Sequence, residues 1–451
     1  MKNETYNHNL SAMRLLTAAL FFLLLACNSN ADKQAAATQV KRDAELVHQS
    51  VRRLNDIVIY EIFAPPVASR VYAYSTLALY EGGRWSDTSY PSLTAQLNGF
   101  PAMPAPEAGQ QYDFQVAGAK AFFSVVKKLT FTKDSTRITE EAVLARMKEG
   151  MDDKVYEASL AFGEKVADAI WQRATKDNYK EIQGMARYTP SDKPGKWKNT
   201  PPDYLDAIQP FWTKMMPLVM DSSSQFKPVP PPPFSTDKQS AFYLEMKEVY
   251  DTTKVLTEEH KTIARYWDDN PAAVTHKGHM MFANKKPSPG GHWMNITALS
   301  SKKVNHDWMQ ASQAYALVAV AMYDAFISCW DEKFRSEYIR PVTAINENMD
   351  KNWQPLLQTP PFPEYTSGHS VASATIAAML TRIFGDNFAF TDDYEVPYIG
   401  ISRSFPSFIK ASEEACMSRL YGGIHFRSAI MNGRQQGRNL GAFIVGKLQI
   451  K

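Results

Sequence analysis

The chain has 451 residues, long enough for two packed domains or one large domain. Hydrophobic residues make up 44% of it and charged residues 22%, which is ordinary for a globular protein with a sizeable core. The net charge of +3, with no sustained basic run, argues against nucleic acid as a partner.

Residues 1–26 have the pattern of a targeting segment. An apolar run at residues 15–26 follows basic residues, and its length suits a signal peptide better than a membrane span. The run ends in Leu-Leu-Ala-Cys, which resembles a bacterial lipoprotein box in which Cys27 is lipidated; an ordinary signal with an incidental cysteine is the alternative. We expect an exported cell-envelope protein, in the outer membrane or periplasm. The polar residues 27–45 would form its tether, with membrane contact only through lipid on Cys27.

Beyond the tether the sequence predicts an all-α fold. Residues 158–173, 237–268 and 306–327 carry apolar side chains at the three- and four-residue spacing of amphipathic helices. Alternating strand patterns with Asn-Gly or Asp-Gly turns are not evident. No internal stretch approaches about 18 uninterrupted apolar residues, so we expect no membrane span after the N-terminus. Cys329 and Cys416 are too few to indicate a disulfide framework.

A proline-rich run at residues 226–234 divides the chain. Proline is excluded from a helix interior, so this run must be extended. We interpret it as the crossover between an N-terminal helical half, residues 46–234, and a C-terminal helical half, residues 235–451. A ligand for a proline-binding domain is the alternative, and it does not suit an exported bacterial protein. Residues 287–293 form a second irregular region, expected to be a loop near the site.

Three histidines lie in or near this second region: His276, His279 and His292. Such a group suggests a metal cluster. They are expected on loops, however, without ligand spacing on a common face. We therefore expect no separate metal site there.

The residues that carry chemistry gather near the C-terminus in three motifs of fixed order. These motifs are Lys333 with Arg340-Pro341, then Ser367-Gly368-His369, then Ser418-Arg419 with His425. Together they supply three cations, a glycine-opened turn and two imidazoles. That combination suits the binding of a tetrahedral oxyanion, with proton or nucleophile chemistry on it. Each motif alone is common; the three in order favour one site.

Helix geometry predicts how the side chains of the first two motifs are arranged. Lys333 and Arg340 are seven residues apart, two helical turns, so on one helix both would project from the same face. Ser367 and Gly368 open a helix expected over residues 367–378, whose first N–H groups can bind an anion.

The third motif is expected to be a helix–turn–helix corner. Arg419 should close one helix, Gly422-Gly423 should make the bend, and His425 should open the next helix. The tight bend would bring the Arg419 guanidinium and the His425 imidazole toward one point.

Taken together, the motifs resemble the signature K-x6-R-P, P-S-G-H and S-R-x5-H. That signature is shared by vanadium-dependent haloperoxidases and the acid and lipid phosphatases. Trp330, three residues before Lys333, and the double-length chain favour the haloperoxidases, while the lack of internal membrane spans counts against lipid phosphatases. Residues 362–369 and 421–428 look most like the bacterial iodoperoxidase branch. The resemblance implies two helical bundles with the site in the C-terminal one.

The resemblance also implies a role for each matched residue. His425 would hold vanadium through a ring nitrogen, and His369 would take a proton from peroxide. Lys333 would polarise the bound peroxide, while Trp330 and Phe362 would lie near the halide. The oxygens of the vanadate cofactor would be bound by Lys333, Arg340, Ser367, the Gly368 N–H and Arg419. The expected activity is oxidation of halide, iodide above all, by hydrogen peroxide to hypohalous acid, with an organic compound as optional acceptor.

Two other functions are open. An exported acid phosphatase would use the same site for phosphate, with His425 as nucleophile and His369 protonating the leaving alcohol. An exported carbohydrate-binding lipoprotein would explain the lipoprotein box and the aromatic residues. It would leave the cations without a function.

The chain departs from the family pattern twice. Thr366 replaces a proline, which is tolerable because both residues can precede a helix. Ala429 replaces an aspartate that in the family helps to orient the histidine ligand, so another group must fix the imidazole of His425. Asp268 or Asp269 is expected to provide a carboxylate elsewhere in the site.

Overall fold

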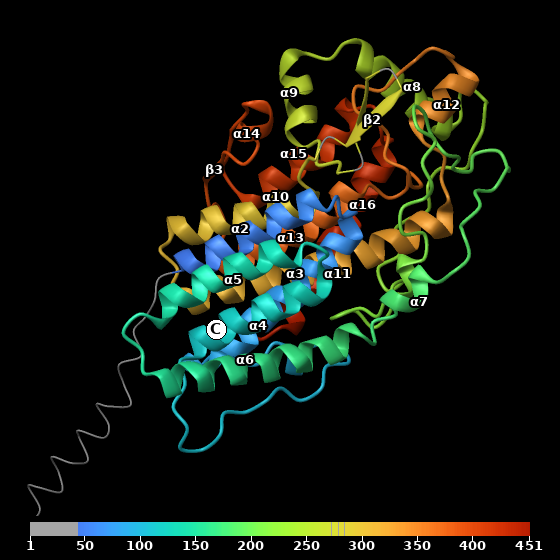
Figure 1. Cartoon of the computed structure of the whole chain (residues 1–451). Helices are drawn as coiled ribbons and strands as arrows, with labels where there is room; N and C mark the ends of the chain where they lie inside the picture. Colours follow the sequence, from blue (N-terminus) through green and yellow to red (C-terminus); the bar gives the residue numbers. More distant parts are fainter. Residues whose placement is uncertain (1–43, 272, 278, 284) are drawn as a thin grey trace, which may run out of the picture. The chain divides into compact units, whose positions relative to one another are not determined.

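The computed structural model describes residues 44–451 except 272, 278 and 284 (Figure 1). The predicted signal peptide, almost all of the tether and Cys27 lie outside the described residues. Most of the described chain is helical, as the sequence predicts. The helices of its first part are α2 (Glu45–Tyr60), α3 (Pro65–Gly83), α4 (Phe114–Leu129), α5 (Lys133–Lys148), α6 (Asp153–Ala174) and α7 (Tyr179–Gln183).

The proline-rich run has no regular structure, and further helices follow it. They are α8 (Ala241–Lys254), α9 (Glu258–Tyr266), α10 (Pro289–Lys303), α11 (Trp308–Ser336), α12 (Pro341–Asn348), α13 (Gly368–Phe384), α14 (Val396–Ile399), α15 (Phe408–Tyr421) and α16 (Arg427–Lys447). Short 3-10 turns occur at Arg84–Ser86, Thr94–Gln96 and Trp212–Lys214.

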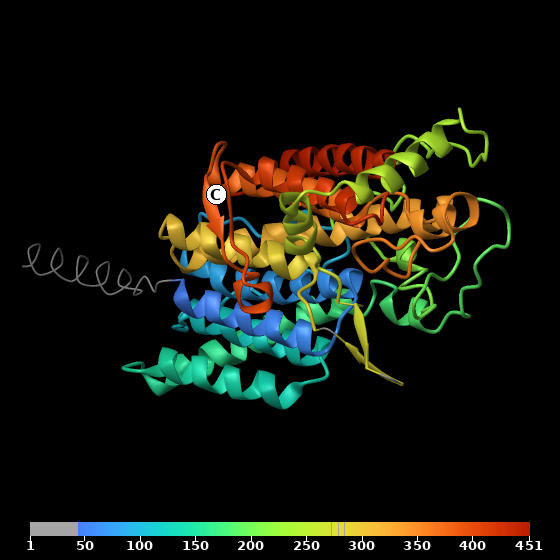
Figure 2. The same cartoon turned by 90° about the horizontal axis from the view of Figure 1, so that it is seen from above.

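The helices form successive layers around α11. Seen from above, α15 and α16 lie on one side of α10 and α11, and α2 to α6 lie on the other (Figure 2). Helix α11 packs against α3 of the first part and α13 of the second, so one continuous hydrophobic core joins both halves. By length and composition α11 is apolar enough to cross a membrane, but its apolar stretch is wholly buried inside the protein.

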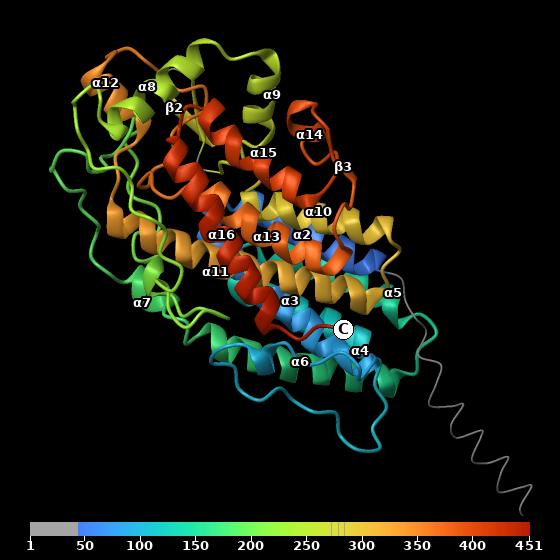
Figure 3. The same ribbon diagram turned by 180° about the vertical axis from the view of Figure 1, so that it is seen from behind.

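Glycines let α4 approach α3 closely in the first part of the chain, and let α16 approach α13 closely in the second part. A Cβ on Gly118 of α4 would lie 2.7 Å from the Leu79 carbonyl of α3, too close for any side chain. Helix α16 packs on α13 in the same way, since a Cβ on Gly437 would lie 2.3 Å from the Val371 carbonyl (Figure 3). This second contact brings the start of α16 next to the N-terminus of α13.

Two of the three predicted helices are confirmed. Residues 158–173 lie within α6, and residues 308–327 of the other stretch lie within α11, which runs nine residues further. The prediction of one helix over 237–268 is wrong. The chain breaks after α8, and the Thr257 side chain accepts a hydrogen bond from the His260 N–H to begin α9.

The expected loop at 287–293 is also wrong, because α10 begins at Pro289. The Ser288 hydroxyl accepts the Gly291 N–H at 3.2 Å, and proline and the glycines occupy the first turn, where a helix tolerates them. His292 is therefore a buried helical residue, whereas His279 lies exposed on a hairpin turn. These two histidines do not share a site.

Two small antiparallel hairpins were not expected from the sequence. Strands β1 (Val274–Lys277) and β2 (Met280–Ala283) pair at one place, and β3 (Phe390–Asp392) and β4 (Arg403–Phe405) at another. With three or four residues per strand, each is too short to show a clear alternating pattern.

Candidate active site

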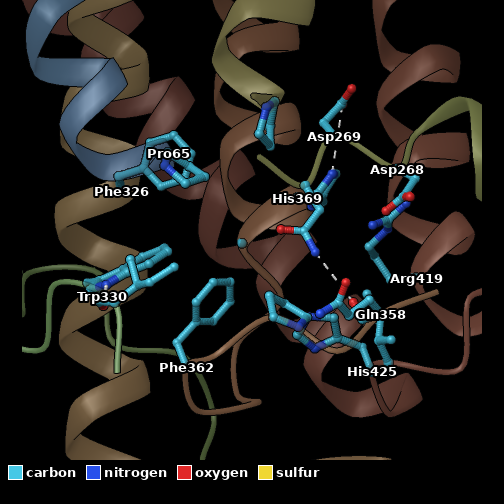
Figure 4. A pocket seen from close by; sticks show the side chains of 16 residues that line it. Pro65, Asp268, Asp269, Phe326, Trp330, Gln358, Phe362, His369, Arg419 and His425 are labelled. Carbon is cyan, nitrogen blue, oxygen red and sulfur yellow. Dashed lines mark hydrogen bonds and ion pairs between the residues drawn. The ribbon is translucent and has the colours of Figure 1, made fainter. Parts of the chain in front are cut away.

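The candidate site lies at the N-terminus of α13, where the three motifs meet around a cavity of about 40 Å³ (Figure 4). That is room for about three water-sized oxygens. Gly368, His369, Arg419 and His425 line the cavity, together with Trp330 and Phe362. The first part of the chain contributes Pro65, at the start of α3, and Ile208. Both halves therefore enclose the site.

Ser367 is the N-cap of α13, as the predicted helix start requires. Its hydroxyl accepts the Ser370 N–H at 3.3 Å, and its own N–H donates to the Ala429 carbonyl at 3.1 Å. The unpaired N–H groups of the first helical turn, including that of Gly368, face the cavity end of the helix. This turn is the anion-binding end of the helix.

Lys333 and Arg340 are not on one helix, contrary to expectation. Glu337 adopts a left-handed backbone conformation with a φ of 48° and ends α11, and Arg340 is the N-cap of α12, ahead of Pro341. The two side chains still converge, because both reach the backbone of the segment before Ser367.

Backbone carbonyls hold all three cations. Lys333 Nζ donates to the Pro363 and Glu364 carbonyls at 2.8 and 3.0 Å. Arg340 Nε donates to the Phe362 carbonyl at 2.8 Å, and its Nη1 donates to the Ile424 carbonyl at 2.9 Å. These bonds orient the cations without cancelling their charge.

Arg419, on the last turn of α15, is anchored to the chain just before Asp268 and Asp269. Its Nη2 donates to the Trp267 carbonyl, and its Nε to the Ser418 hydroxyl at 2.9 Å. Burial lowers the pKa of Arg419 below its usual range. Burial likewise lowers the pKa of Lys333 to about 7 and that of Arg340 to about 10. Such shifts indicate positive charge that lacks a counter-ion.

The tautomer of His425 follows from its partners. Arg340 Nη1 lies 3.2 Å from His425 Nε2, and a guanidinium can only donate, so Nε2 is the acceptor. The ring proton then sits on Nδ1 and is donated to Glu364 Oε1 at 2.8 Å. Burial and the neighbouring cations lower the pKa of His425 well below its usual range. His425 is therefore a neutral imidazole with an electron pair on Nε2.

Glu364 supplies the orienting group that Ala429 cannot. Its Oε1 also accepts the Phe426 N–H at 2.8 Å, which fixes the carboxyl between the ring and the backbone. Ala429 is fully buried among apolar residues, where an aspartate would have no room for water. Sequence reasoning missed Glu364, although a lone acid in the apolar, proline-rich segment before Ser367 is a signal that could have found it.

His369, in the first turn of α13, faces Asp269 across the cavity (Figure 4). Its Nε2 lies 3.8 Å from Asp269 Oδ2, and it has no hydrogen-bond partner among the residues that the structure describes. Burial, then Arg419 and His292, lower the pKa of His369 well below its usual range. His369 is thus a neutral imidazole whose Nε2 is not engaged by another described residue. Asp268 also lines the cavity and pairs with Lys286 at 2.5 Å.

The aromatic residues Trp330 and Phe362 form the apolar wall of the cavity. Their rings lie 5.0 Å apart, and the Phe362 ring also covers Lys333 Nζ and the Arg340 guanidinium, each at 5.0 Å. Lys333 and Arg340 do not line the cavity directly but lie next to it, in contact with the Phe362 ring.

The arrangement suits an oxyanion. Arg340 Nη2 is a buried donor that finds no hydrogen-bond partner in the described part of the chain. Burial raises the pKa of Glu364 to about 8, so the acid nearest to the cations carries little charge at neutral pH. Three buried cations, a helix N-terminus and two neutral imidazoles define an anion-binding active site in a helical fold.

Comparisons with known proteins agree with this description. Residues 313–450 match the family model of the second helical-bundle domain of VCPO. Over 118 residues the chain is 30% identical to vanadium chloroperoxidase of Curvularia inaequalis, a match over 23% of this chain and 19% of that protein. The chain therefore spans about a fifth of that curated relative.

Solved structures extend the match to the whole fold. A bacterial vanadium-dependent iodoperoxidase is 45% identical, with a TM-score of 0.86 over 91% of this chain and 98% of that one. A bacterial vanadium-dependent chloroperoxidase in its holo form is 16% identical, with a TM-score of 0.65 over 86% and 93% of the two chains, and shares the fold. The present chain belongs to the vanadium haloperoxidase family. The unpartnered Arg340 Nη2 fits an oxygen of vanadate, and His425 Nε2, whose electron pair here accepts from Arg340 Nη1, is the ring nitrogen that could hold the metal.

Proposed function

We propose that the protein is a vanadate-dependent peroxidase that oxidises halide, iodide above all, with hydrogen peroxide to hypohalous acid. One observation carries this proposal: three buried cations, Lys333, Arg340 and Arg419, lie in or next to the cavity at the N-terminus of α13 and form no ion pair with a carboxylate among the described residues. The 45% identical bacterial iodoperoxidase supports it.

The vanadate-binding roles follow from the donors. His425 Nε2 would hold vanadium, while Lys333, Arg340 and Arg419 would bind its oxygens and neutralise their charge. Ser367 and the Gly368 N–H would add donors from the helix end. When bound, vanadium supplies Lewis-acid activation of peroxide.

His369 has the acid–base role in this proposal. Its lowered pKa leaves the imidazole neutral at neutral pH, so its unprotonated ring nitrogen would take a proton from incoming hydrogen peroxide. Asp269, 3.8 Å away, would stabilise the imidazolium that forms. Trp330 and Phe362 would keep water out while halide approaches.

A pair of assays tests the proposal. Purified protein is incubated with vanadate, peroxide and iodide, and separately with a phosphate ester and no vanadate. We expect iodide oxidation that saturates with vanadate. Ester hydrolysis without iodide oxidation would favour instead an acid phosphatase with His425 as nucleophile.

Iodide is the preferred halide in this proposal. It is the most easily oxidised of the common halides, whereas bromide and chloride demand a more electrophilic oxidant. By family resemblance, phenylalanine at position 362 permits the harder oxidation, while the loss of the aspartate at position 429 and the iodoperoxidase-like motifs disfavour it. We expect efficient iodide oxidation, weak or no bromide oxidation and no chloride oxidation. Chloride turnover comparable to that of iodide in steady-state kinetics would refute this.

Export and lipid anchoring remain a proposal from sequence alone. Cys27→Ser should convert a lipid-labelled protein of the membrane fraction into an unlabelled one. If metabolic labelling finds no lipid on the native protein, the cysteine only ends an ordinary signal.

A further inference from the structure

A second group of ligand-type side chains lies beside the cavity, around Asp269, which lines it. Asp269 follows α9, His292 is in the first turn of α10, and Glu395 precedes α14. One carboxylate or imidazole atom from each lies within 4.8 Å of the others, and the three residues are 3%, 0% and 5% exposed. These residues belong to separate segments and meet only in the fold.

A fourth residue fixes the orientation of His292. Its Nε2 lies 2.7 Å from Asp392 Oδ2, and that oxygen also accepts the Tyr266 hydroxyl at 2.6 Å. The Nδ1 atom then points at Asp269, 3.0 and 3.2 Å from its two oxygens. Histidines that bind metals usually donate their other ring N–H to a carboxylate in this way.

The cluster contains three carboxyl groups and one imidazole. Asp269, Asp392 and Glu395 surround the single imidazole of His292, and the nearby Lys286 is already paired with Asp268. Glu395 Oε1 is buried and finds no hydrogen-bond partner in the residues that the structure describes. An unpaired buried carboxylate is costly, which points to a missing cation.

We propose that Asp269, His292 and Glu395 bind a divalent metal ion of the Zn²⁺ class. One imidazole and two carboxylates suit Zn²⁺, whereas Mg²⁺ and Ca²⁺ prefer oxygen ligands alone. Tetrahedral coordination at about 2.0–2.2 Å places neighbouring ligand atoms about 3.3–3.6 Å apart, and His292 Nδ1 and Asp269 Oδ2 already lie 3.2 Å apart. The ligand atoms of all three residues lie within 4.8 Å of one another, so an adjustment of the Glu395 side chain would bring them onto one ion.

This ion would be separate from vanadate, because it shares none of the residues assigned to that cofactor. It would touch the active site through one residue only. Asp269 lies 3.8 Å from His369, so a metal on Asp269 would hold that carboxylate in place and withdraw its charge. The ion would thus position the acid–base histidine without contacting substrate.

Zinc binding to the full chain, measured without vanadate, tests the site independently of the proposed peroxidase activity. After chelation and dialysis, the protein is titrated with Zn²⁺ in a calorimeter, and bound metal is counted by mass spectrometry. We expect one equivalent per chain. Glu395→Gln keeps the size of the side chain and should weaken binding about 10- to 100-fold or more, and His292→Ala should abolish it.

The matched control is His279→Ala, which removes an exposed histidine on a hairpin turn and should leave binding unchanged. Circular dichroism establishes that each variant is folded. Absence of stoichiometric binding to folded native protein would overturn the proposal. So would equal zinc affinity in native protein and Glu395→Gln, or loss of binding in His279→Ala alone.

Discussion

Buried cations in this protein are paired with a carboxylate at one place and left without a counter-ion at another. In the N-terminal half, Arg70 Nε bonds Asp177 at 2.6 Å, and Tyr74 donates to the same carboxylate at 3.0 Å. Burial alone would lower the pKa of Arg70, but Asp177 outweighs it and the pKa is raised. In the C-terminal half, the pKa values of Arg340 and Arg419 are lowered.

The difference lies in the counter-ion. The Arg70 group contains its own carboxylate and is complete without a ligand. The cations of the active site are oriented by carbonyls, and within the described chain they form no ion pair with a carboxylate. A buried charge of this second kind is available to an anionic ligand, because no carboxylate neutralises it. The following experiments test whether the unpaired cations and their neighbours serve ligand binding, while the paired Arg70 serves stability.

The largest effect is expected at His425. His425→Ala removes the only proposed bond from protein to vanadium, so halide oxidation should fall below detection. The helical fold should persist, since the ring contributes one hydrogen bond to Glu364. Activity assays after vanadate addition, beside circular dichroism, check both statements. Normal turnover by the variant would remove His425 from the site.

The two arginine groups can be compared directly. Arg70→Ala should lower the free energy of unfolding by about 3–5 kcal/mol, because it leaves Asp177 buried and unpaired. Arg340→Ala should cost clearly less in vanadate-free protein but abolish the rise in stability that vanadate gives the native protein. Urea unfolding of both variants, with and without vanadate, is the measurement. Equal losses of unfolding free energy in the two vanadate-free variants would contradict the proposed difference between Arg70 and Arg340.

His369 should matter for turnover more than for binding. In His369→Ala the cations and His425 remain, so vanadate should still bind, while peroxide activation should slow by about a hundredfold or more. Rapid kinetics together with vanadate titration separates the two quantities. A pH–rate profile identical to that of the native protein would contradict the assignment.

Glu364 is expected to act through the ring of His425. Glu364→Gln can still accept the Nδ1 proton but no longer offers a carboxyl group, so vanadate affinity should fall about 10- to 100-fold. Equilibrium dialysis with vanadate gives the affinity. The matched control is Glu245→Gln, a half-buried carboxyl that bonds Ser428 on the neighbouring helix and should leave the affinity unchanged.

The smallest effect is a pH dependence of anion binding. Sulfate is a suitable probe because its charge does not change in this range. The pKa of Lys333 is about 7 without ligand, and a bound anion would raise it. Affinity should therefore be complete below pH 7 and fall above it, by at most about tenfold per pH unit. Ionisation of Glu364, with a pKa of about 8, acts in the same direction. Calorimetry from pH 6 to 9 on native protein and Lys333→Met checks this, and a rising affinity would refute it.

Sequence reasoning found what local rules determine. Ser367 was recognised as a helix start because N-capping needs only neighbouring residues, and the apolar spacing of α6 and α11 is likewise local. The order of the cationic motifs was enough to place them in one site.

What it missed depends on tertiary contacts. The break between Lys333 and Arg340 rests on one left-handed residue, Glu337, which spacing cannot reveal. The contact between Glu364 and His425 joins residues 61 positions apart, and the family pattern places the orienting carboxylate at position 429 instead. Burial of His292 depends on where α10 begins, which the glycines and prolines concealed.

The carbonyl bonds to Lys333 and Arg340 have a consequence for engineering. Because the acceptors are the backbone oxygens of residues 362–364, the path of the chain holds the cations, and the side chain at position 362 is free to vary. Phe362 forms part of the cavity wall. Libraries of substitutions at position 362 can therefore be screened for altered halide preference while the backbone keeps Lys333 and Arg340 in place. If side-chain carboxylates held these cations instead, substituting those side chains would also move the charges.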